Sequence, residues 1–213
     1  MSEPCATVFV LDDDATVCEA IGDLLNSVGL DARLFLSPDN LIENISEAAC
    51  LILDVYLAGV NGLDVQQRLA NEEIDLPIIF LSGKADIPIS VRAMKAGAAE
   101  FLTKPVRDKD LLDAVQQALV RSRAMQQQKR GLALLRERYV TLTAREKEVM
   151  GLVISGLLNK QVAAALGTQV VTVKIQRSRV MRKMAAESFA DLVRMAQRLG
   201  IPSRDNSRGS TVP

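Results

Sequence analysis

The sequence predicts a doubly wound α/β domain of the (βα)5 type, then a helical linker, then an all-α domain of four helices that contains a helix-turn-helix. In the first half, short apolar runs alternate with segments whose apolar residues recur at helical spacing, which is typical of a parallel sheet covered by helices. From Asp108 onward only helical spacings remain. The charge divides at the same place, because residues 1–106 carry 17 acidic and 6 basic side chains (net −11) and residues 107–213 carry 9 and 20 (net +11). The two halves are therefore expected to be separate domains with different electrostatic roles.

Five strands are expected in the first half, each a short run rich in apolar residues. Their ranges are 7–11, 32–36, 50–54, 77–81 and 100–102. Gly29 is placed to end the helix after the first strand, and Ser37-Pro38 has the order of an N-cap and a first helical residue. A further helix is expected after Gly62, and Asp86 is expected to open the helix before the fifth strand. Right-handed crossovers would bring the carboxyl ends of all five strands to one edge of the sheet.

The second half begins with a helix capped by Asp108 that continues through the polar stretch 121–130 as a semi-rigid linker. Thr143 and Glu146 then form a capping box that opens the first helix of the second domain. A small helix, 159–166, and a strongly basic helix, 171–184, follow, with a tight turn between them that contains Gly167; this order describes a helix-turn-helix. The expected divisions are a first domain at 5–121, a helical linker at 122–138, a second domain at 139–201 and a disordered tail at 202–213.

Composition excludes several classes of protein and of chemistry. The sequence contains no histidine, so acid–base catalysis by histidine, histidine metal ligands and a phosphohistidine on this chain are excluded. Its three cysteines share no metal-type spacing, which favours reduced structural thiols. No run of about 18 apolar residues and no signal-peptide pattern is present, so we expect a cytoplasmic protein with no membrane partner.

Polar side chains follow the predicted strands at their carboxyl ends, where open parallel sheets place their chemistry. These are Asp12 and Asp13 after the first strand, Asp54 at the end of the third, Ser82 after the fourth and Lys104 after the fifth. Three carboxylates in one crevice repel one another strongly, which favours a bound cation, and an all-oxygen site suits Mg²⁺. A cation, an ammonium and a hydroxyl around a free carboxylate make a phosphoryl acceptor site. For Asp54 alone the alternative is a plain turn cap.

These residues carry a resemblance to a known family. Leu11-Asp12-Asp13-Asp14, Leu53-Asp54, Leu81-Ser82-Gly83 and Lys104-Pro105 resemble the receiver domain of two-component response regulators. The second half is similar to the LuxR/NarL-type output domain, and the combination resembles FixJ-type transcriptional regulators, including those of styrene and toluene catabolism. The motifs of the second resemblance are Leu142-Thr143-Ala144-Arg145-Glu146, Asn159-Lys160-Gln161-Val162-Ala163 and Thr172-Val173-Lys174.

The resemblance implies a role for each residue of the acidic edge. Asp54 would be the phosphoacceptor, and it would hold Mg²⁺ together with Asp12, Asp13 and the main-chain carbonyl of Tyr56.

The resemblance also implies the groups that respond to the phosphate. Lys104 would pair with the phosphoryl group, and Ser82 would hydrogen-bond it and reposition on activation. Phe101 would be the switch aromatic, with a plain core phenylalanine as the alternative. The Lys104–Pro105 peptide bond would be cis.

The same resemblance places helix 171–184 in the major groove of DNA. Lys174, Ile175 and Ser178 share one face of that helix and would approach base edges. The remaining expected contacts, to bases or phosphates, are Asn159, Lys160, Thr172, Gln176, Arg177 and Arg179. Val173, Val180 and Met184 are expected in the core instead.

The sequence therefore predicts a phosphorylation-dependent transcriptional regulator of a two-component system, and not an enzyme. The implied partners are a cognate sensor histidine kinase, promoter DNA, a second copy of the chain in a homodimer when phosphorylated, and RNA polymerase. One alternative is a phosphatase of the haloacid-dehalogenase type with Asp12 as nucleophile, but the acidic metal pair that this chemistry needs after Lys104 is missing. The other alternative is a pseudo-receiver that regulates without phosphorylation.

Overall fold

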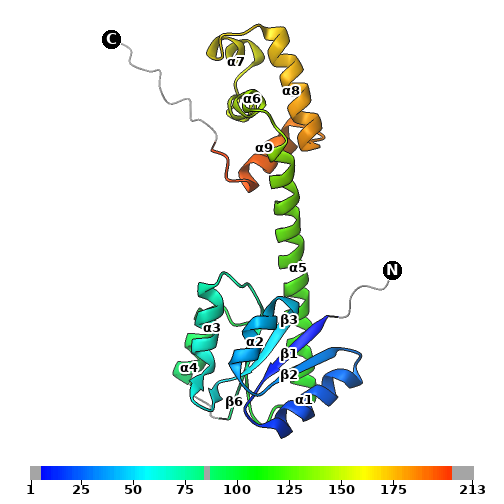
Figure 1. Ribbon diagram of the computed structural model, residues 1–213, viewed down its shortest axis with the longest axis vertical. Coiled ribbons are helices and arrows are strands. Elements are labelled where there is room, and N and C mark those ends of the chain that lie inside the picture. The colour runs from blue at the N-terminus through cyan, green and yellow to red at the C-terminus, as the bar shows by residue number, and fades with distance from the viewer. Residues whose placement is uncertain (1–5, 84–86, 203–213) are drawn as a thin grey trace. The chain divides into compact units, whose positions relative to one another are not determined.

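The computed structural model describes residues 6–83 and 87–202 (Figure 1). Its internal contacts divide the chain into two compact units, residues 1–126 and 127–213. Asp86 and residues 203–213 of the expected tail lie outside the described residues. Among the residues that are described, no helix is both long enough and apolar enough to cross a membrane.

The first unit is built on a five-stranded parallel sheet, as the sequence predicts, and the order of its strands is β2-β1-β3-β6-β7. Its strands are β1 (Thr7–Leu11), β2 (Asp31–Phe35), β3 (Ala48–Asp54), β6 (Ile78–Ser82) and β7 (Glu100–Thr103). In this order β1 lies beside β3 and β3 beside β6, with Leu11 opposite Leu53 and Asp54 opposite Leu81. The residues that end β1, β3 and β6 therefore meet at one edge of the sheet.

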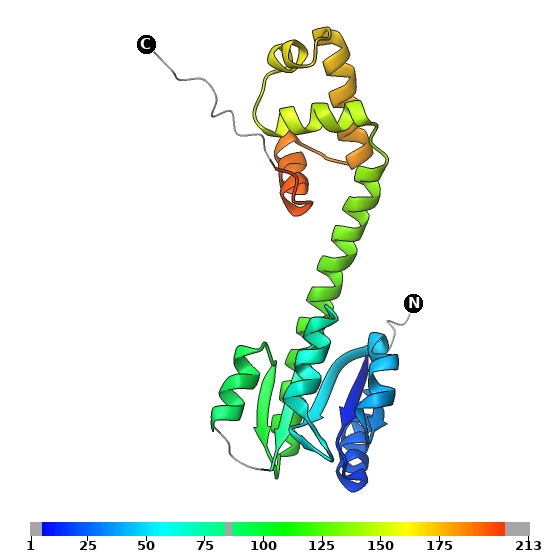
Figure 2. The same ribbon diagram turned by 60° about the vertical axis from the view of Figure 1, so that its left-hand side comes forward.

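Helices cover both faces of the sheet (Figures 1 and 2). They are α1 (Ala15–Ser27), α2 (Pro38–Asn44), the 3₁₀ helix η1 (Ile45–Glu47), α3 (Gly62–Asn71), α4 (Ile87–Lys95) and the first part of α5 (Asp108–Val140). Leu41 of α2, Leu69 of α3 and Ala93 of α4 are buried in one apolar cluster with the sheet. Leu25 of α1 and Val115 of α5 are buried in the cluster on the other face. The double layer fixes the sheet and leaves its carboxyl edge for the polar residues.

A small hairpin that the sequence analysis did not foresee follows Asp54 directly. Its strands β4 (Tyr56–Leu57) and β5 (Val60–Asn61) pair antiparallel, and Gly59 lies between them with φ of +83°. Strands of two residues carry no readable alternation, so only the Ala58-Gly59 turn gives a signal in the sequence.

The second unit begins within α5 and adds α6 (Ala144–Ile154), α7 (Asn159–Ala165), α8 (Val170–Met184) and α9 (Phe189–Arg198). The predicted capping box is present, since the Thr143 hydroxyl accepts from the Glu146 N–H and the Glu146 carboxylate accepts from the Thr143 N–H. Helix α8 begins one residue before the predicted start, because Gln169 takes the N-cap position. The residues expected in the core, Val173, Val180 and Met184, are all buried.

Candidate acidic site and nucleic-acid interface

Asp54 lies at the end of β3 and is only 5% exposed. Its Oδ2 accepts a hydrogen bond of 2.8 Å from the main-chain N–H of Tyr56, which fixes the carboxylate relative to the β4–β5 hairpin. The first residue of α3, Gly62, approaches the back of this residue so closely that an added Cβ would lie 2.4 Å from the Asp54 main-chain oxygen. Only glycine fits there, and sequence reasoning identified Gly62 as a helix start but not as part of the site.

Lys104 joins two of the acidic residues. Its Nζ lies 2.5 Å from Oδ2 of Asp12 and 2.8 Å from Oδ1 of Asp54. Burial by itself would lower the pKa of Lys104, but the hydrogen bonds to Asp12 and Asp54 outweigh it, and the pKa lies above its ordinary value. The ammonium is therefore charged at neutral pH and partly offsets the two carboxylates.

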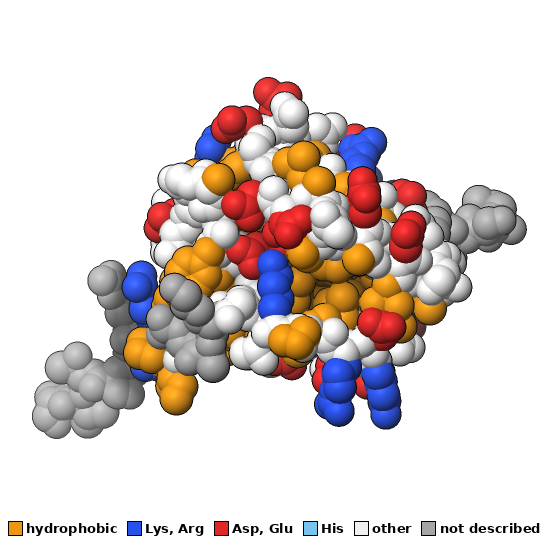
Figure 3. Space-filling model, turned by 90° about the horizontal axis from the view of Figure 1, so that it is seen from below, with side chains coloured by type: hydrophobic (Ala, Val, Ile, Leu, Met, Phe, Trp, Pro, Cys, Tyr) orange, Lys and Arg blue, Asp and Glu red, His pale blue; other side chains and the backbone are white. Residues whose placement is uncertain are grey.

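Asp12, Asp13 and Asp54 can each place one carboxylate oxygen within 4.8 Å of the others. Asp12 and Asp54 are buried, while Asp13 is exposed and closes the cluster on the solvent side. Figure 3 looks onto the carboxyl ends of the strands and shows acidic side chains gathered near the middle of this face. A donor set made only of oxygen, with no histidine or cysteine, fits a hard divalent cation such as Mg²⁺.

The remaining residues expected at this edge are Ser82, Phe101 and Tyr56. Ser82 is fully buried at the end of β6, and its carbonyl accepts a hydrogen bond of 2.7 Å from the Lys104 N–H. The ring of Phe101 is partly buried, with its centroid 6.2 Å from that of Phe80. Tyr56 is exposed, and the Lys104–Pro105 peptide bond is cis, as the resemblance implies. The topology thus gathers Asp12, Asp13, Asp54 and Lys104 in one cluster.

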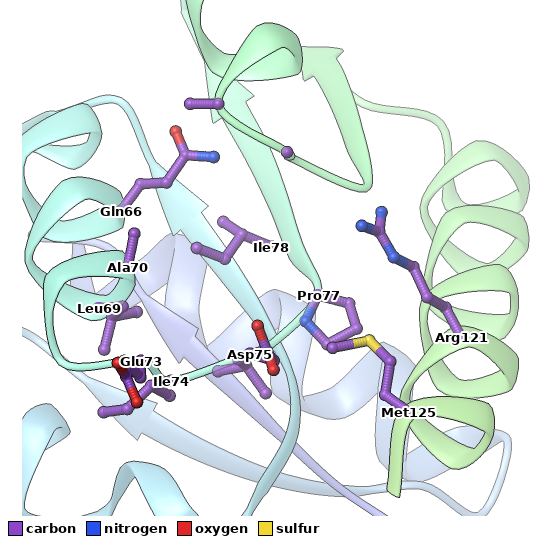
Figure 4. A pocket seen from close by; sticks show the side chains of 13 residues that line it. Gln66, Leu69, Ala70, Glu73, Ile74, Asp75, Pro77, Ile78, Arg121 and Met125 are labelled. Atoms are coloured by element: carbon purple, nitrogen blue, oxygen red, sulfur yellow. The ribbon is translucent and has the colours of Figure 1, made fainter. Parts of the chain in front are cut away.

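A separate hollow of about 230 Å³ is lined by residues of α3, the start of β6 and α5, among them Gln66, Pro77, Arg121 and Met125 (Figure 4). It adjoins the amino end of β6, where the strand begins at Ile78. None of the predicted site residues lines it.

In the second unit, one face of α8 presents a shallow hollow of about 460 Å³ to solvent. The residues that line it are Lys174, Ile175, Ser178, Arg179 and Arg182. Four of these were predicted to contact DNA, and Lys174, Ile175 and Ser178 share a face as their spacing requires. Val171, one turn before Ile175, is 64% exposed and was not singled out in the sequence, although its position in the helical pattern could have identified it.

The other residues predicted to contact DNA lie differently. Lys160 is exposed, Thr172 and Gln176 are half-buried, and the side-chain oxygen of Gln176 is buried without a hydrogen-bond partner among the described residues. Arg177 is half-buried, and its guanidinium donates to Oδ1 of Asn159 over 3.2 Å. These two are thus bonded to each other across α7 and α8.

Two family models match the chain and together cover most of it. Residues 8–116 match the response regulator receiver domain, and residues 140–196 match the bacterial regulatory proteins of the luxR family. The chain belongs to the two-component response regulators. As a response regulator with a LuxR-type DNA-binding domain it is a transcriptional regulator and not an enzyme, so the phosphatase alternative is set aside.

Individual relatives of this response regulator are similar over nearly their whole length. Nodulation protein W of Bradyrhizobium diazoefficiens is 48% identical over 92% of this chain and 87% of its own length. The response regulator protein TodT of Pseudomonas putida is 41% identical over 93% of this chain and 88% of its own. Among solved structures, that of the response regulator StyR has a TM-score of 0.80 and 38% identity, covering 91% of this chain and 99% of its own.

Membership in this family gives the two regions their general roles. Receiver domains bind Mg²⁺ at an acidic pocket of the kind formed by Asp12, Asp13 and Asp54. The receiver domain implies a histidine kinase as partner, and the luxR-family domain implies binding to DNA.

Proposed function

We propose that Asp54 accepts a phosphoryl group from a cognate sensor histidine kinase, and that the phosphate controls DNA binding by the second domain. The observation that carries the proposal is the position of Asp54, a buried carboxylate that lies 2.8 Å from the Lys104 ammonium and beside Asp12 and Asp13. A structural turn cap needs none of these neighbours.

The chemistry follows from the groups around Asp54. A carboxylate oxygen of Asp54 forms a bond to phosphorus, in line with the phosphorus–nitrogen bond on the histidine of the kinase. That phosphorus–nitrogen bond breaks, and its electrons stay on the imidazole of the kinase. Lys104 neutralises a phosphoryl oxygen, and the hydroxyl of Ser82 donates a hydrogen bond to another. Mg²⁺, held by Asp12, Asp13, Asp54 and the carbonyl of Tyr56, would supply the additional positive charge that the acidic cluster needs.

The phosphate would act on the rest of the molecule by shifting a two-state receiver. Ser82 moves toward the phosphoryl group, and Phe101, whose ring packs near Phe80, changes position with it. Moving a population from mostly inactive to mostly active takes about 5 kcal/mol of differential stabilisation. We propose that the active state forms a homodimer, binds promoter DNA in the cytoplasm and engages RNA polymerase.

At the DNA, we propose that α8 enters the major groove with Lys174, Ile175 and Ser178 toward the base edges. This assignment is supported by the exposed hollow that these three residues line with Arg179. The other proposed members of the interface are Asn159, Lys160, Thr172, Gln176, Arg177 and Arg179. The proposed boundaries are 5–121 for the receiver, 122–138 for the linker and 139–201 for the DNA-binding domain.

Incubation with a small phosphodonor and Mg²⁺, read by intact-protein and peptide mass spectrometry, tests the phosphorylation site. The wild-type chain and the control Asp64→Asn, which alters an exposed carboxylate on α3, should each gain one phosphoryl group, and Asp54→Asn should gain none. Stoichiometric phosphorylation of Asp54→Asn elsewhere in the chain would refute the assignment.

DNA binding is tested by titrating a labelled duplex that the wild-type chain has enriched from a random-sequence pool. The affinity should rise with phosphodonor and should fall with salt with a log–log slope of several units. A flat salt response would contradict the proposed contacts, and an affinity that ignores the phosphodonor would favour the pseudo-receiver.

A further inference from the structure

Arg177 differs from Lys174 and Arg179 of the same helix because its side chain is engaged within the domain. Its guanidinium donates to Oδ1 of Asn159, at the start of α7, and lies 5.3 Å from the ring centroid of Phe189, at the start of α9. It is half-buried, whereas Lys174 and Arg179 are exposed on the face that lines the hollow. Arg177 thus ties the beginnings of α7 and α9 to the middle of α8.

The chemistry of this contact fixes the orientation of the Asn159 amide. A guanidinium has only donors, so its partner atom must be the amide oxygen and not the amide nitrogen. With Oδ1 held by Arg177, the Nδ2 group is the part of the Asn159 side chain that can donate to another acceptor. At an interface with DNA, the abundant acceptors are phosphate oxygens.

We propose that Arg177 is a positioning residue, which orients the Asn159 amide so that its Nδ2 group donates to a DNA phosphate. This inference rests on the proposed DNA-binding function and refines it, since Arg177 then serves the interface through Asn159 and not by its own contact. The cation–π contact with the Phe189 ring also holds the guanidinium in place.

The salt dependence of binding separates a positioning role from direct contact. An Arg that neutralises a phosphate contributes about 0.9 to the log–log salt slope, whereas a neutral amide contributes nothing. Loss of Arg177 should therefore weaken binding and leave the slope unchanged. Loss of Arg179, which is exposed beside the hollow, should lower the slope by about 0.9.

The experiment is a double-mutant cycle on the full chain, with the enriched duplex as probe. Arg177→Met keeps an apolar stem against Phe189, and Asn159→Ala removes the amide. Each single variant should weaken binding by about 5- to 10-fold, the scale of one hydrogen bond, and the double variant should be no weaker than either. Arg179→Met is the matched control, and its effect should multiply with that of Asn159→Ala.

A purely structural role for Arg177 predicts a different result. In that case Arg177→Met would weaken DNA binding by the same factor in the wild-type chain and in the Asn159→Ala variant. Multiplying effects of Arg177→Met and Asn159→Ala would overturn the proposal, as would a salt slope that falls by about one unit in Arg177→Met. If Arg177→Met unfolds the domain by circular dichroism, Arg177→Lys replaces it in the cycle, since Lys keeps the charge but lacks the planar fork. Absence of salt-dependent binding by the wild-type chain would instead refute the proposed function itself.

Discussion

Replacing Gly62 by alanine tests how tightly the hairpin and α3 hold the proposed phosphoacceptor. The added Cβ would lie 2.4 Å from the Asp54 main-chain oxygen and 3.2 Å from both Val55 Cα and Phe80 Cε1. Ordinary contacts lie near 3.5 Å, so the main chain at Asp54 must move by about 1 Å. Overpacking of this kind costs about 1–3 kcal/mol of folding stability. A misplacement of about 1 Å at a reacting group lowers the rate by about 100-fold.

The assay is the initial rate of phosphoryl incorporation from a small phosphodonor, with thermal unfolding measured on the same sample. Gly83→Ala is the matched control, because a Cβ at Gly83 meets no atom of the described residues within 4 Å although the residue directly follows Ser82. Gly62→Ala should remain folded at the assay temperature and lose most of its rate, and Gly83→Ala should behave like the wild type. A Gly62→Ala protein that is destabilised but phosphorylated at the wild-type rate would refute the argument that this close approach positions Asp54.

The structure makes four more predictions. The Lys183 ammonium lies 2.6 Å from the buried Glu146 carboxylate, and together with the Thr143 N–H it holds the pKa of that carboxyl below its usual range. The DNA-binding domain should therefore lose stability as the pH falls through that lowered pKa, which thermal melts measure. Glu146→Gln should remove this pH dependence. Lys183→Met should destabilise the same domain by about 1.5–3 kcal/mol at neutral pH in urea titrations, because it removes the only ion-pair partner that Glu146 has among the described residues and leaves that buried charge with the Thr143 N–H alone. Burial raises the pKa of the Cys50 thiol to about 12, so iodoacetamide at pH 8 should label Cys50 only after unfolding, as read by peptide mass spectrometry. Chelation of divalent cations should abolish phosphorylation of Asp54 and leave the unfolding midpoint of the DNA-binding domain unchanged.

The architecture was predictable because each local signal agrees with its neighbours. Buried strands such as β3 read as unbroken apolar runs, and the capping box of Thr143 and Glu146 marks where α6 begins. Right-handed crossovers then place the carboxyl ends of the strands at one edge, which could be predicted without any knowledge of distances. That β1 lies directly beside β3, with Asp12 and Asp54 at adjacent strand ends, is known only from the structure.

The details of the site depend on contacts between residues distant in the sequence, which periodicity does not encode. Lys104 was expected to meet a phosphoryl group, but its bonds to both Asp12 and Asp54 require the separations found in the fold. The close approach of Gly62 depends on a hairpin too short to carry a pattern. Arg177 is a further example of a contact that the sequence does not encode. Helical spacing places it on α8 but does not reveal that its guanidinium contacts Asn159 and Phe189.

The charges of the acidic site show that Lys104 alone does not neutralise its three carboxylates. Asp12, Asp13 and Asp54 carry three negative charges against one positive charge on Lys104, so the cluster has a net charge of −2 when its carboxylates are ionised. An acyl phosphate adds about one further negative charge, because the carboxylate is replaced by a dianionic phosphoryl group. Lys104 already donates to Asp12 and Asp54, so only the third of its three N–H groups is left for a phosphoryl oxygen unless it gives up one of these bonds. The added negative charge and the limited donors of Lys104 both favour a second source of positive charge beside Asp13. Asp13 is the exposed member of the cluster, so a hydrated cation can enter from its side.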